Sequence, residues 1–233
     1  MTAGTPTDML IEIVADLVCP WCYIGQRRLE RALKHASAPA PRLVWRAFQL
    51  NPDMPLDGVP RLAYLTAKFG GTFHAERIYE AIGEAGAAEG IRFEFARIAR
   101  TPNSLNAHRL KRLARRHGIE PDVTTRLYRA YFEEARDIGV AGVLADIAAE
   151  AGLGRPEAAR YLASDADRAA VLAEDIGARR LGINGVPCVI IGGKYALSGA
   201  QEPEFFLPLF DLARQEATAS VERGTHAMID GAS

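Results

Sequence analysis

The sequence predicts an α/β fold in which a central mixed four-stranded sheet is interrupted by a large all-helical insertion. Apart from the short alternating segment 91–95, strand-like segments occur near the two ends of the chain, before residue 49 and after residue 185. The segment 61–181 between them is rich in Ala, Arg and Glu and repeats its apolar residues at helical spacing. The expected order is therefore strand, helix, strand, a block of helices, two strands and a closing helix.

The first part of the sheet is predicted as a βαβ unit. Residues 10–15 and 43–48 are short apolar runs rich in β-branched or aromatic side chains, which is typical of buried strands. Pro20 suits the first position of the intervening helix, which should run to about His35. Strand, helix and strand in this order predict parallel pairing with a right-handed crossover.

The insertion is predicted as a series of helices whose ends are marked by Gly118, Gly139 and Gly152. The alternating segment 91–95 is a candidate for a short extended piece. The helices are expected at residues 61–69, 73–88, 103–117, 122–135, 140–151, 156–163 and 167–181.

The last part of the sheet is predicted as a hairpin followed by a helix. Residues 186–191 and 194–198 flank Gly192 and Gly193, and two glycines between strands favour a primed turn. Residues 201 to about 216 form the closing helix. Without the insertion, this order is the topology of thioredoxin. The expected division is a thioredoxin-like domain in two parts (8–60 and 182–218), a helical insertion subdomain (61–181) and a flexible tail (219–233).

Composition excludes some functional classes. The chain has 233 residues, 28 Lys and Arg against 29 Asp and Glu, and a net charge of −1, so nucleic acid is not expected as the main partner. No apolar run is long enough for a membrane span, and the N-terminus has no basic region like that of a secretory signal. We therefore expect a cytoplasmic protein that does not bind membranes. With 3 cysteines, it is not held together by disulfides.

Cys19 and Cys22 form a Cys-x-x-Cys pair at the predicted start of a helix. Residues three apart in a helix lie about one turn from each other, which suits a disulfide. Cys19 faces the positive end of the helix dipole, and this favours a thiolate over a thiol. The pattern predicts a redox-active disulfide in which Cys19 attacks the substrate and Cys22 resolves the mixed disulfide.

The two residues inside the pair tune its redox potential. Pro20 stiffens the turn, and Trp21 offers no positive charge to the thiolate. The expected potential lies between about −270 and −120 mV, below the oxidising extreme. A zinc site is the alternative for such a pair, but zinc usually takes four ligands and Cys188 is the only further thiol. No metal and no cofactor other than the redox-active disulfide are predicted.

Several motifs together resemble the DsbA family, most closely its FrnE-like branch. The resemblance covers about residues 9–212 and implies a thioredoxin fold with a helical insertion and dithiol–disulfide exchange. Its partners would be protein thiols and disulfides or a small thiol substrate, with glutathione or another low-molecular-weight thiol as a candidate co-substrate and a homodimer left open. The motifs are DLVCPWCYIG (16–25), LNPD (50–53), NSLNAHR (103–109), GINGVP (182–187) and SGAQ (198–201).

The resemblance also assigns a role to Val186 and Pro187. It implies that Pro187 follows a cis peptide bond, and that this loop lies beside the cysteine pair and pairs with the substrate backbone. Cys188 departs from the family pattern, which commonly has an aromatic or aliphatic residue there. It is either an inert core residue, which we favour, or a third thiol close to Cys19.

Other polar residues near the motifs have two interpretations each. Asp16 shapes the turn before Cys19, which we favour, or relays protons for Cys22. His108 either packs on its helix or faces the active-site cleft, where it would bind substrate or tune the thiolate. The basic residues of the same helix are expected to form a solvated face, with an anionic ligand as the alternative; they are Arg109, Lys111, Arg112, Arg115 and Arg116.

Two other functions remain open at this point. Kappa-class glutathione transferases and 2-hydroxychromene-2-carboxylate isomerases share this fold and its insertion, but normally have a serine near the position of Cys19 and lack the pair. A chaperone that holds unfolded clients in the groove between the two subdomains is the non-enzymatic alternative. Both cysteines favour the oxidoreductase.

Overall fold

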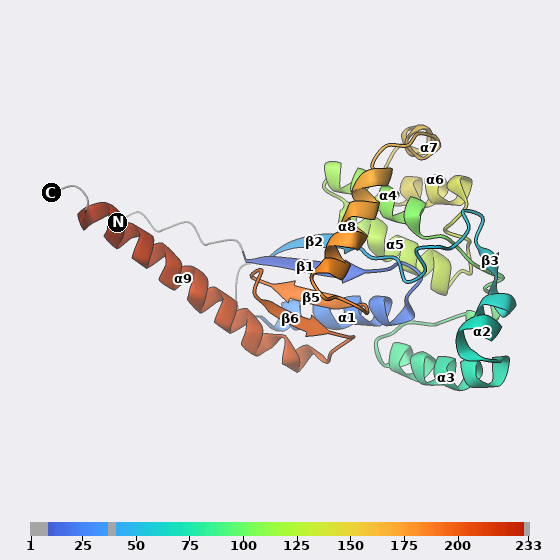
Figure 1. Cartoon of the computed structure of the whole chain (residues 1–233), viewed down its shortest axis with the longest axis horizontal. Coiled ribbons are helices and arrows are strands. Elements are labelled where there is room, and N and C mark those ends of the chain that lie inside the picture. The colour runs from blue at the N-terminus through green and yellow to red at the C-terminus, as the bar shows by residue number, and fades with distance from the viewer. Residues whose placement is uncertain (1–8, 37–40, 231–233) are drawn as a thin grey trace.

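The computed structural model describes residues 9–36 and 41–230 and contains the predicted mixed four-stranded sheet (Figure 1). The strand order is β2-β1-β5-β6, with β1 parallel to β2 and antiparallel to β5, and β5 antiparallel to β6. The strands are β1 (Leu10–Ala15), β2 (Arg42–Ala47), β5 (Cys188–Ile191) and β6 (Tyr195–Ser198).

One face of the sheet packs against α1 (Pro20–His35) and the first turns of α9 (Leu207–Asp230). Ile11 on β1 is paired with Ile191 on β5, and Ile13 is paired with Val189. All four side chains belong to one buried core that also contains residues of α1 and α9. This face therefore fixes α1, and with it the cysteine pair, against the sheet.

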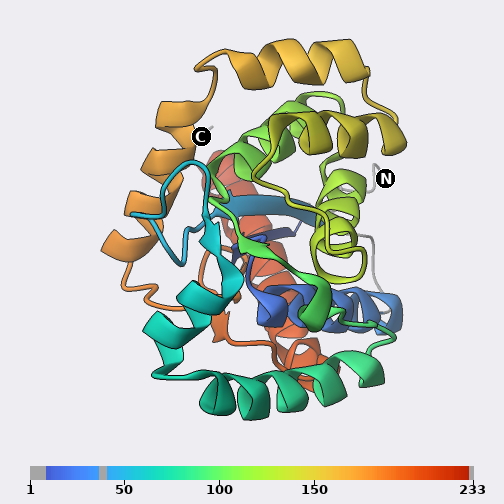
Figure 2. The ribbon, with the colours of Figure 1, turned by 90° about the vertical axis from the view of Figure 1, so that its right-hand side faces the viewer.

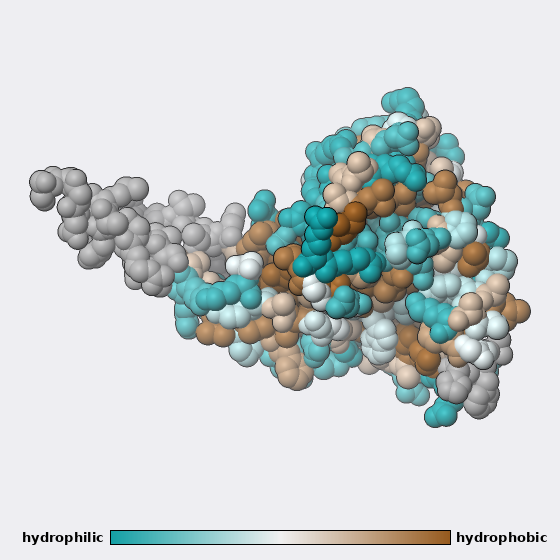
Figure 3. All heavy atoms as spheres, in the orientation of Figure 1, coloured by the Kyte–Doolittle hydropathy of each residue, from teal (hydrophilic) through white to brown (hydrophobic). Residues whose placement is uncertain are grey.

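The opposite face of the sheet packs against α8 (Arg168–Arg180), which crosses in front of it in Figure 1. Val14 and Cys188 are paired neighbours on β1 and β5 and form a second buried cluster with Phe48 and Ala178. Apolar side chains are also exposed on α8, and Figure 3 shows apolar and polar residues interspersed over this side of the molecule.

Seven helices of the described chain lie between β2 and β5, and each matches a predicted helix to within three residues at its ends. Figure 2 shows α2 and α3 at the opposite end of the molecule from α6 and α7. None of the described helices is long and apolar enough to cross a membrane. Besides α8, they are α2 (Arg61–Phe69), α3 (Thr72–Ala88), α4 (Leu105–Arg116), α5 (Glu120–Phe132), α6 (Ala141–Glu150) and α7 (Arg155–Ala163).

Two local predictions are wrong. Segment 91–95 is not a strand; a 3₁₀ turn, η1 (Phe95–Arg97), begins at its last residue. A small sheet forms instead between β3 (Val59–Pro60) and β4 (Arg100–Thr101), whose two residues each are too few for an alternating pattern. The closing helix, expected to end near residue 216, continues to Asp230 after the short η2 (Pro203–Phe205).

The backbone conformation of the turn between β5 and β6 explains why the turn contains two glycines. Gly192 and Gly193 have φ values of 61° and 69°, and a primed turn requires positive φ at both central positions. The amide of Lys194 closes the turn by donating to the carbonyl of Ile191 at 3.2 Å. The predicted primed turn is present here.

The prediction of a solvated basic face on α4 is wrong for Arg109 and Lys111, which are buried, whereas Arg116 is exposed. Lys111 is buried beside the ring of Trp45, and burial lowers its pKa from the usual value. Arg109 is also buried. Three further arginines of α4 form ion pairs with carboxylates; the pairs are Arg112–Glu174, Arg115–Glu120 and Arg116–Asp167.

Arg109 binds the end of α7 and the connection to α8. Its guanidinium donates to the carbonyls of Tyr161, Leu162, Ser164 and Ala166 at 2.5–3.3 Å. The last carbonyls of a helix have no partner within the helix, so Arg109 satisfies groups that burial would otherwise leave unpaired. This interaction holds α4 against the α7–α8 connection.

Replacement of Arg109 by Leu should therefore destabilise the protein by roughly 3 kcal/mol, because buried carbonyls lose their donors. The measurement is urea unfolding followed by circular dichroism. Arg155→Leu is the matched control, since Arg155 pairs with Asp146 on the surface and both side chains are exposed. Its cost should stay below about 1 kcal/mol. Equal losses in the two variants would contradict this account of Arg109.

Candidate active site

Cys19 is the N-cap residue of α1, and Pro20 occupies the first helical position as predicted. Cys19 has extended backbone angles (φ −95°, ψ 114°), and its carbonyl accepts the amide of Cys22 at 3.1 Å. Both residues are free thiols and buried, with 4% of Cys19 and 1% of Cys22 exposed. The side chain between them, Trp21, is 38% exposed. The pair thus lies just below the surface, with the apolar Trp21 beside it.

The loop before β5 contacts Cys19 directly. The Cys19 thiol donates to the carbonyl of Val186 at a Sγ–O distance of 3.6 Å. The Val186–Pro187 peptide bond is cis, as the resemblance implies. Gly25 on α1 allows this contact, because a Cβ there would lie 2.9 Å from Cγ of Pro187. The first turns of α1 and the Val186–Pro187 loop therefore pack without space for one further methyl group.

Cys22 remains protonated more readily than an ordinary thiol. Burial raises its pKa well above the usual value of 9.0, and a hydrogen bond with Cys19 and the charge of Cys19 act in the same direction. Tyr128 on α5 shares a hydrogen bond with Cys22, and burial raises the pKa of this phenol as well. Cys22 is therefore a neutral thiol across the ordinary pH range in this structure.

Asp16 organises the turn between β1 and α1. Its buried carboxylate accepts the amides of Leu50 at 2.7 Å and Val18 at 3.4 Å, and its carbonyl accepts the amide of Cys19 at 3.2 Å. Its charge also raises the pKa of Cys22. Asp16 thus has the turn-forming contacts that we favoured, and it is also close enough to Cys22 to affect its ionisation.

His108 lies in the interior and does not face an open cleft. It is 1% exposed, and its Nε2 lies 3.4 Å from a carboxylate oxygen of Asp16. Neither ring nitrogen makes a hydrogen bond within the described residues. The interpretation of His108 as open to substrate does not match this burial, whereas the alternative, a packed histidine, does. An influence of His108 on the thiols would act through Asp16.

Cys188 belongs to a different part of the core from the pair. It is buried with Val14, Phe48 and Ala178 on the α8 side of the sheet, whereas Cys19 and Cys22 belong to the main core cluster. Burial raises the pKa of its thiol, although a hydrogen bond with Ser198 opposes the shift. This environment favours the interpretation of Cys188 as an inert core residue over that of a third thiol close to Cys19.

Aromatic residues around Cys22 were missed by the sequence analysis. The ring of Tyr23 stacks on that of Tyr128 with centroids 5.1 Å apart. Tyr23 adjoins the motif, but nothing in the sequence marks Tyr128, which lies more than a hundred residues away. Over the ranges that the structure describes, no group of three or more His, Cys, Asp or Glu side chains could hold a metal ion.

Comparison with known protein families assigns this architecture. A family model, the DSBA-like thioredoxin domain, matches residues 10–210. The chain belongs to this family. Among solved structures, the chain is similar to a probable DsbA oxidoreductase from Streptomyces coelicolor, with 33% identity and a TM-score of 0.83, covering 89% of this chain and 91% of that chain. The DsbA-type thiol–disulfide oxidoreductases are thus the general class of enzyme to which it is related.

More distant similarities concern the fold or part of the chain. The cytosolic disulfide reductase DsbM from Pseudomonas aeruginosa, solved with GSH, is 19% identical with a TM-score of 0.62, covering 91% of this chain and 99% of that one. A 2-hydroxychromene-2-carboxylate isomerase is 14% identical with a TM-score of 0.63, covering 94% and 98%. The Bacillus subtilis protein YwbO, itself uncharacterized, is 25% identical over 61% of this chain and 66% of its own length.

The contact between Gly25 and Pro187 predicts a steric penalty. Gly25→Ala should destabilise this DsbA-like protein by about 1–3 kcal/mol, because the new methyl group overlaps the Pro187 ring. Thermal and urea unfolding of the variant measure the cost. Gly177→Ala in α8 is the matched control, since a Cβ there meets no atom within 4 Å. That variant should be neutral or more stable by up to about 1 kcal/mol, and a neutral Gly25→Ala would refute the close approach.

The raised pKa of Cys22 predicts how stability depends on pH. The folded state holds this proton more tightly than the unfolded state, so its contribution is complete below about pH 9 and is lost as the pH rises through the folded pKa. Urea unfolding of the reduced protein above pH 9 should show a loss of up to about 1.4 kcal/mol per pH unit from this proton. The Cys22→Ala variant should lose less unfolding free energy per pH unit above pH 9 than the wild type. The Cys188→Ala variant should keep most of the wild-type dependence of stability on pH. An unchanged slope in Cys22→Ala would contradict the assignment.

Proposed function

We propose that the protein is a dithiol–disulfide oxidoreductase of the DsbA type that works through Cys19 and Cys22. The observation that carries the proposal is the position of Cys19 at the N-cap of α1, hydrogen-bonded to Cys22 and in contact with the carbonyl of Val186. The N-terminus of a helix stabilises a thiolate. Family membership supports this class of reaction.

The proposed reaction has two exchange steps. In the reducing direction the Cys19 thiolate attacks one sulfur of a substrate disulfide, forms a mixed disulfide and releases the first substrate thiolate, which takes up a proton. Cys22 then loses its proton and attacks Sγ of Cys19, which releases the second substrate thiolate and leaves the Cys19–Cys22 disulfide. Two electrons pass to the substrate, and the oxidising direction is the reverse.

The proton of Cys22 controls the second step. Because burial holds this proton, Cys22 needs an acceptor when it attacks. Asp16 is the carboxylate close enough to influence Cys22, and His108 lies beside Asp16. We assign Asp16 as the positioning residue and candidate proton acceptor for this step, with His108 acting through it.

The Val186–Pro187 loop is the proposed docking site for the substrate backbone. Its neighbours Asn184 and Gly185 are exposed, whereas Pro187 is buried against Gly25. A substrate bound along this loop would place its sulfur beside Cys19, since the carbonyl of Val186 already contacts that thiol.

The proposed substrates are protein thiols and disulfides or a low-molecular-weight thiol such as glutathione. The structural similarity to a cytosolic disulfide reductase solved with GSH supports glutathione as a co-substrate and the cytoplasm as the compartment. The uncharged Trp21 supports a potential below the oxidising end of the range of about −270 to −120 mV. Membership of the FrnE-like branch and a homodimeric state are part of the same proposal.

Trapping of the mixed disulfide tests the assignment of the two thiols. Incubated with glutathione disulfide, Cys22→Ser should accumulate glutathione on Cys19, because no second thiol resolves it. Cys19→Ser should lose exchange activity, and Cys188→Ser should keep the wild-type rate as the matched control. Intact-mass spectrometry without reductant reads the result. Glutathione on Cys188, or equal exchange in Cys19→Ser, would refute the proposal.

A transferase or isomerase is the second candidate, favoured by the shared fold with the 2-hydroxychromene-2-carboxylate isomerase. Such enzymes normally have a serine near the position of Cys19, so a second thiol is not needed for their chemistry. Cys22→Ser therefore separates the two classes. Retained isomerase or glutathione-conjugating turnover in this variant would favour the second candidate, and loss of disulfide turnover alone favours the first.

A further inference from the structure

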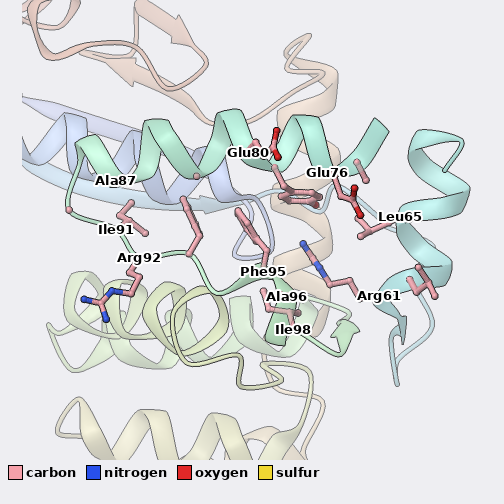
Figure 4. Close-up of a pocket in the computed structure, with 16 residues that line it drawn as sticks. Arg61, Leu65, Glu76, Glu80, Ala87, Ile91, Arg92, Phe95, Ala96 and Ile98 are labelled. Carbon is pink, nitrogen blue, oxygen red and sulfur yellow. The ribbon is translucent and has the colours of Figure 1, made fainter. Parts of the chain in front are cut away.

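A cavity of about 960 Å³ lies between α2, α3 and the segment 90–98 (Figure 4). Small-molecule sites in proteins usually have volumes of about 300–1,000 Å³. None of the residues that line this cavity belongs to the turn before α1, the cysteine pair or the Val186–Pro187 loop. The cavity therefore shares no lining residue with the exchange site, and its lining comes entirely from the insertion.

Three aromatic side chains form one part of the cavity wall: Tyr79, Phe93 and Phe95. Phe95 contacts Tyr79 with centroids 4.5 Å apart and stacks on Phe93 at 4.6 Å. Gly83 on α3 adds no side chain to the cavity, and a Cβ there would meet no atom within 4 Å. The cavity thus has flat apolar walls and open space beside α3, which suits a planar apolar group.

Arg61, the first residue of α2, supplies a positive charge inside this apolar cavity. It is only 7% exposed, and Figure 4 shows its side chain reaching into the cavity toward Phe95. Its guanidinium lies 4.9 Å from the ring centroid of Tyr79 and 5.7 Å from that of Phe95.

The partners of Arg61 are all neutral. It shares a hydrogen bond with Tyr79, but no carboxylate forms an ion pair with it in the part of the chain that the structure describes. Buried charges in proteins are usually paired, because an uncompensated one is costly. Arg109 also has only neutral partners, but all three of its guanidinium nitrogens are hydrogen-bonded to carbonyl or amide oxygens, whereas the guanidinium of Arg61 has only the hydrogen bond with Tyr79 among the described residues. Arg61 therefore has unused capacity for an anion.

We propose that this cavity binds a small molecule with a flat aromatic body and a single carboxylate, and that the carboxylate pairs with Arg61. A guanidinium matches a carboxylate through two parallel hydrogen bonds, and the aromatic body packs against Tyr79, Phe93 and Phe95. Glu76 and Glu80 stand exposed at the edge of the cavity, where they oppose a second negative charge. The ligand therefore carries one anionic group.

The test is isothermal titration calorimetry of the full reduced chain with 2-naphthoate and its uncharged analogue 2-naphthamide. The expected result is saturable binding of one naphthoate per chain, with the amide at least about tenfold weaker because it cannot form the charge-assisted pair. Neither ligand contains sulfur, so the result does not depend on the thiol chemistry.

Three variants locate the binding. Arg61→Met should weaken naphthoate at least about tenfold and leave the amide almost unchanged. Gly83→Leu should weaken both ligands, because the side chain occupies the cavity. Arg92→Met is the matched control: Arg92 also borders the cavity, but it is exposed and Figure 4 shows it directed away from Arg61, so both affinities should stay at the wild-type value.

Several outcomes overturn the proposal. These are no saturable binding of naphthoate, equal affinity for naphthoate and naphthamide, or a loss in Arg92→Met that matches the loss in Arg61→Met. A naphthoate affinity that falls with protein concentration would indicate that a second copy of the chain fills the cavity instead. If Arg61→Met does not fold, Gly83→Leu decides alone: full naphthoate binding by folded Gly83→Leu refutes the site.

Discussion

The turn that delivers Cys19 to the start of α1 depends on Asp16. This one residue ends β1, receives the amide of Leu50 from beyond β2, and accepts the amide of Cys19 through its own carbonyl. Its buried carboxylate also affects the ionisation of Cys22. The strand ends, the helix start and the thiols therefore share one buried carboxyl group, and a change there would disturb the fold and the chemistry together.

The helical insertion completes the surroundings of the pair. α4 brings His108 to Asp16, and α5 brings Tyr128 to Cys22. Both helices are held in place partly by interactions that have no chemical role, such as the binding of the α7–α8 connection by Arg109. The four-stranded sheet and α1 thus position the thiols, while the insertion provides much of the low-dielectric environment that keeps Cys22 protonated.

Much of this arrangement could be predicted from local sequence. Helical spacing located the insertion helices, β-branched runs located the strands, and Pro20 with its flanking cysteines located the helix that begins at the cysteine pair. The failures concern information that is not local. Two-residue strands leave no pattern, the burial of Lys111 depends on Trp45 across the fold, and the contact of Tyr128 with Cys22 spans distant helices. For His108 packing and an open cleft were both left possible, because a helical period does not reveal how many layers cover a face; its burial fits packing.

The pairing of Cys22 with Cys19 also bears on oxidative damage. If peroxide converts Cys19 to a sulfenic acid, the adjacent Cys22 thiol can condense with it, release water and form a disulfide before irreversible sulfinic acid appears. Cys188 has no such partner in its cluster with Val14, Phe48 and Ala178. Its protection is burial, which raises its pKa and keeps it in the less reactive protonated form. The same chain therefore protects its thiols in two ways, by a neighbour at the active site and by the core elsewhere.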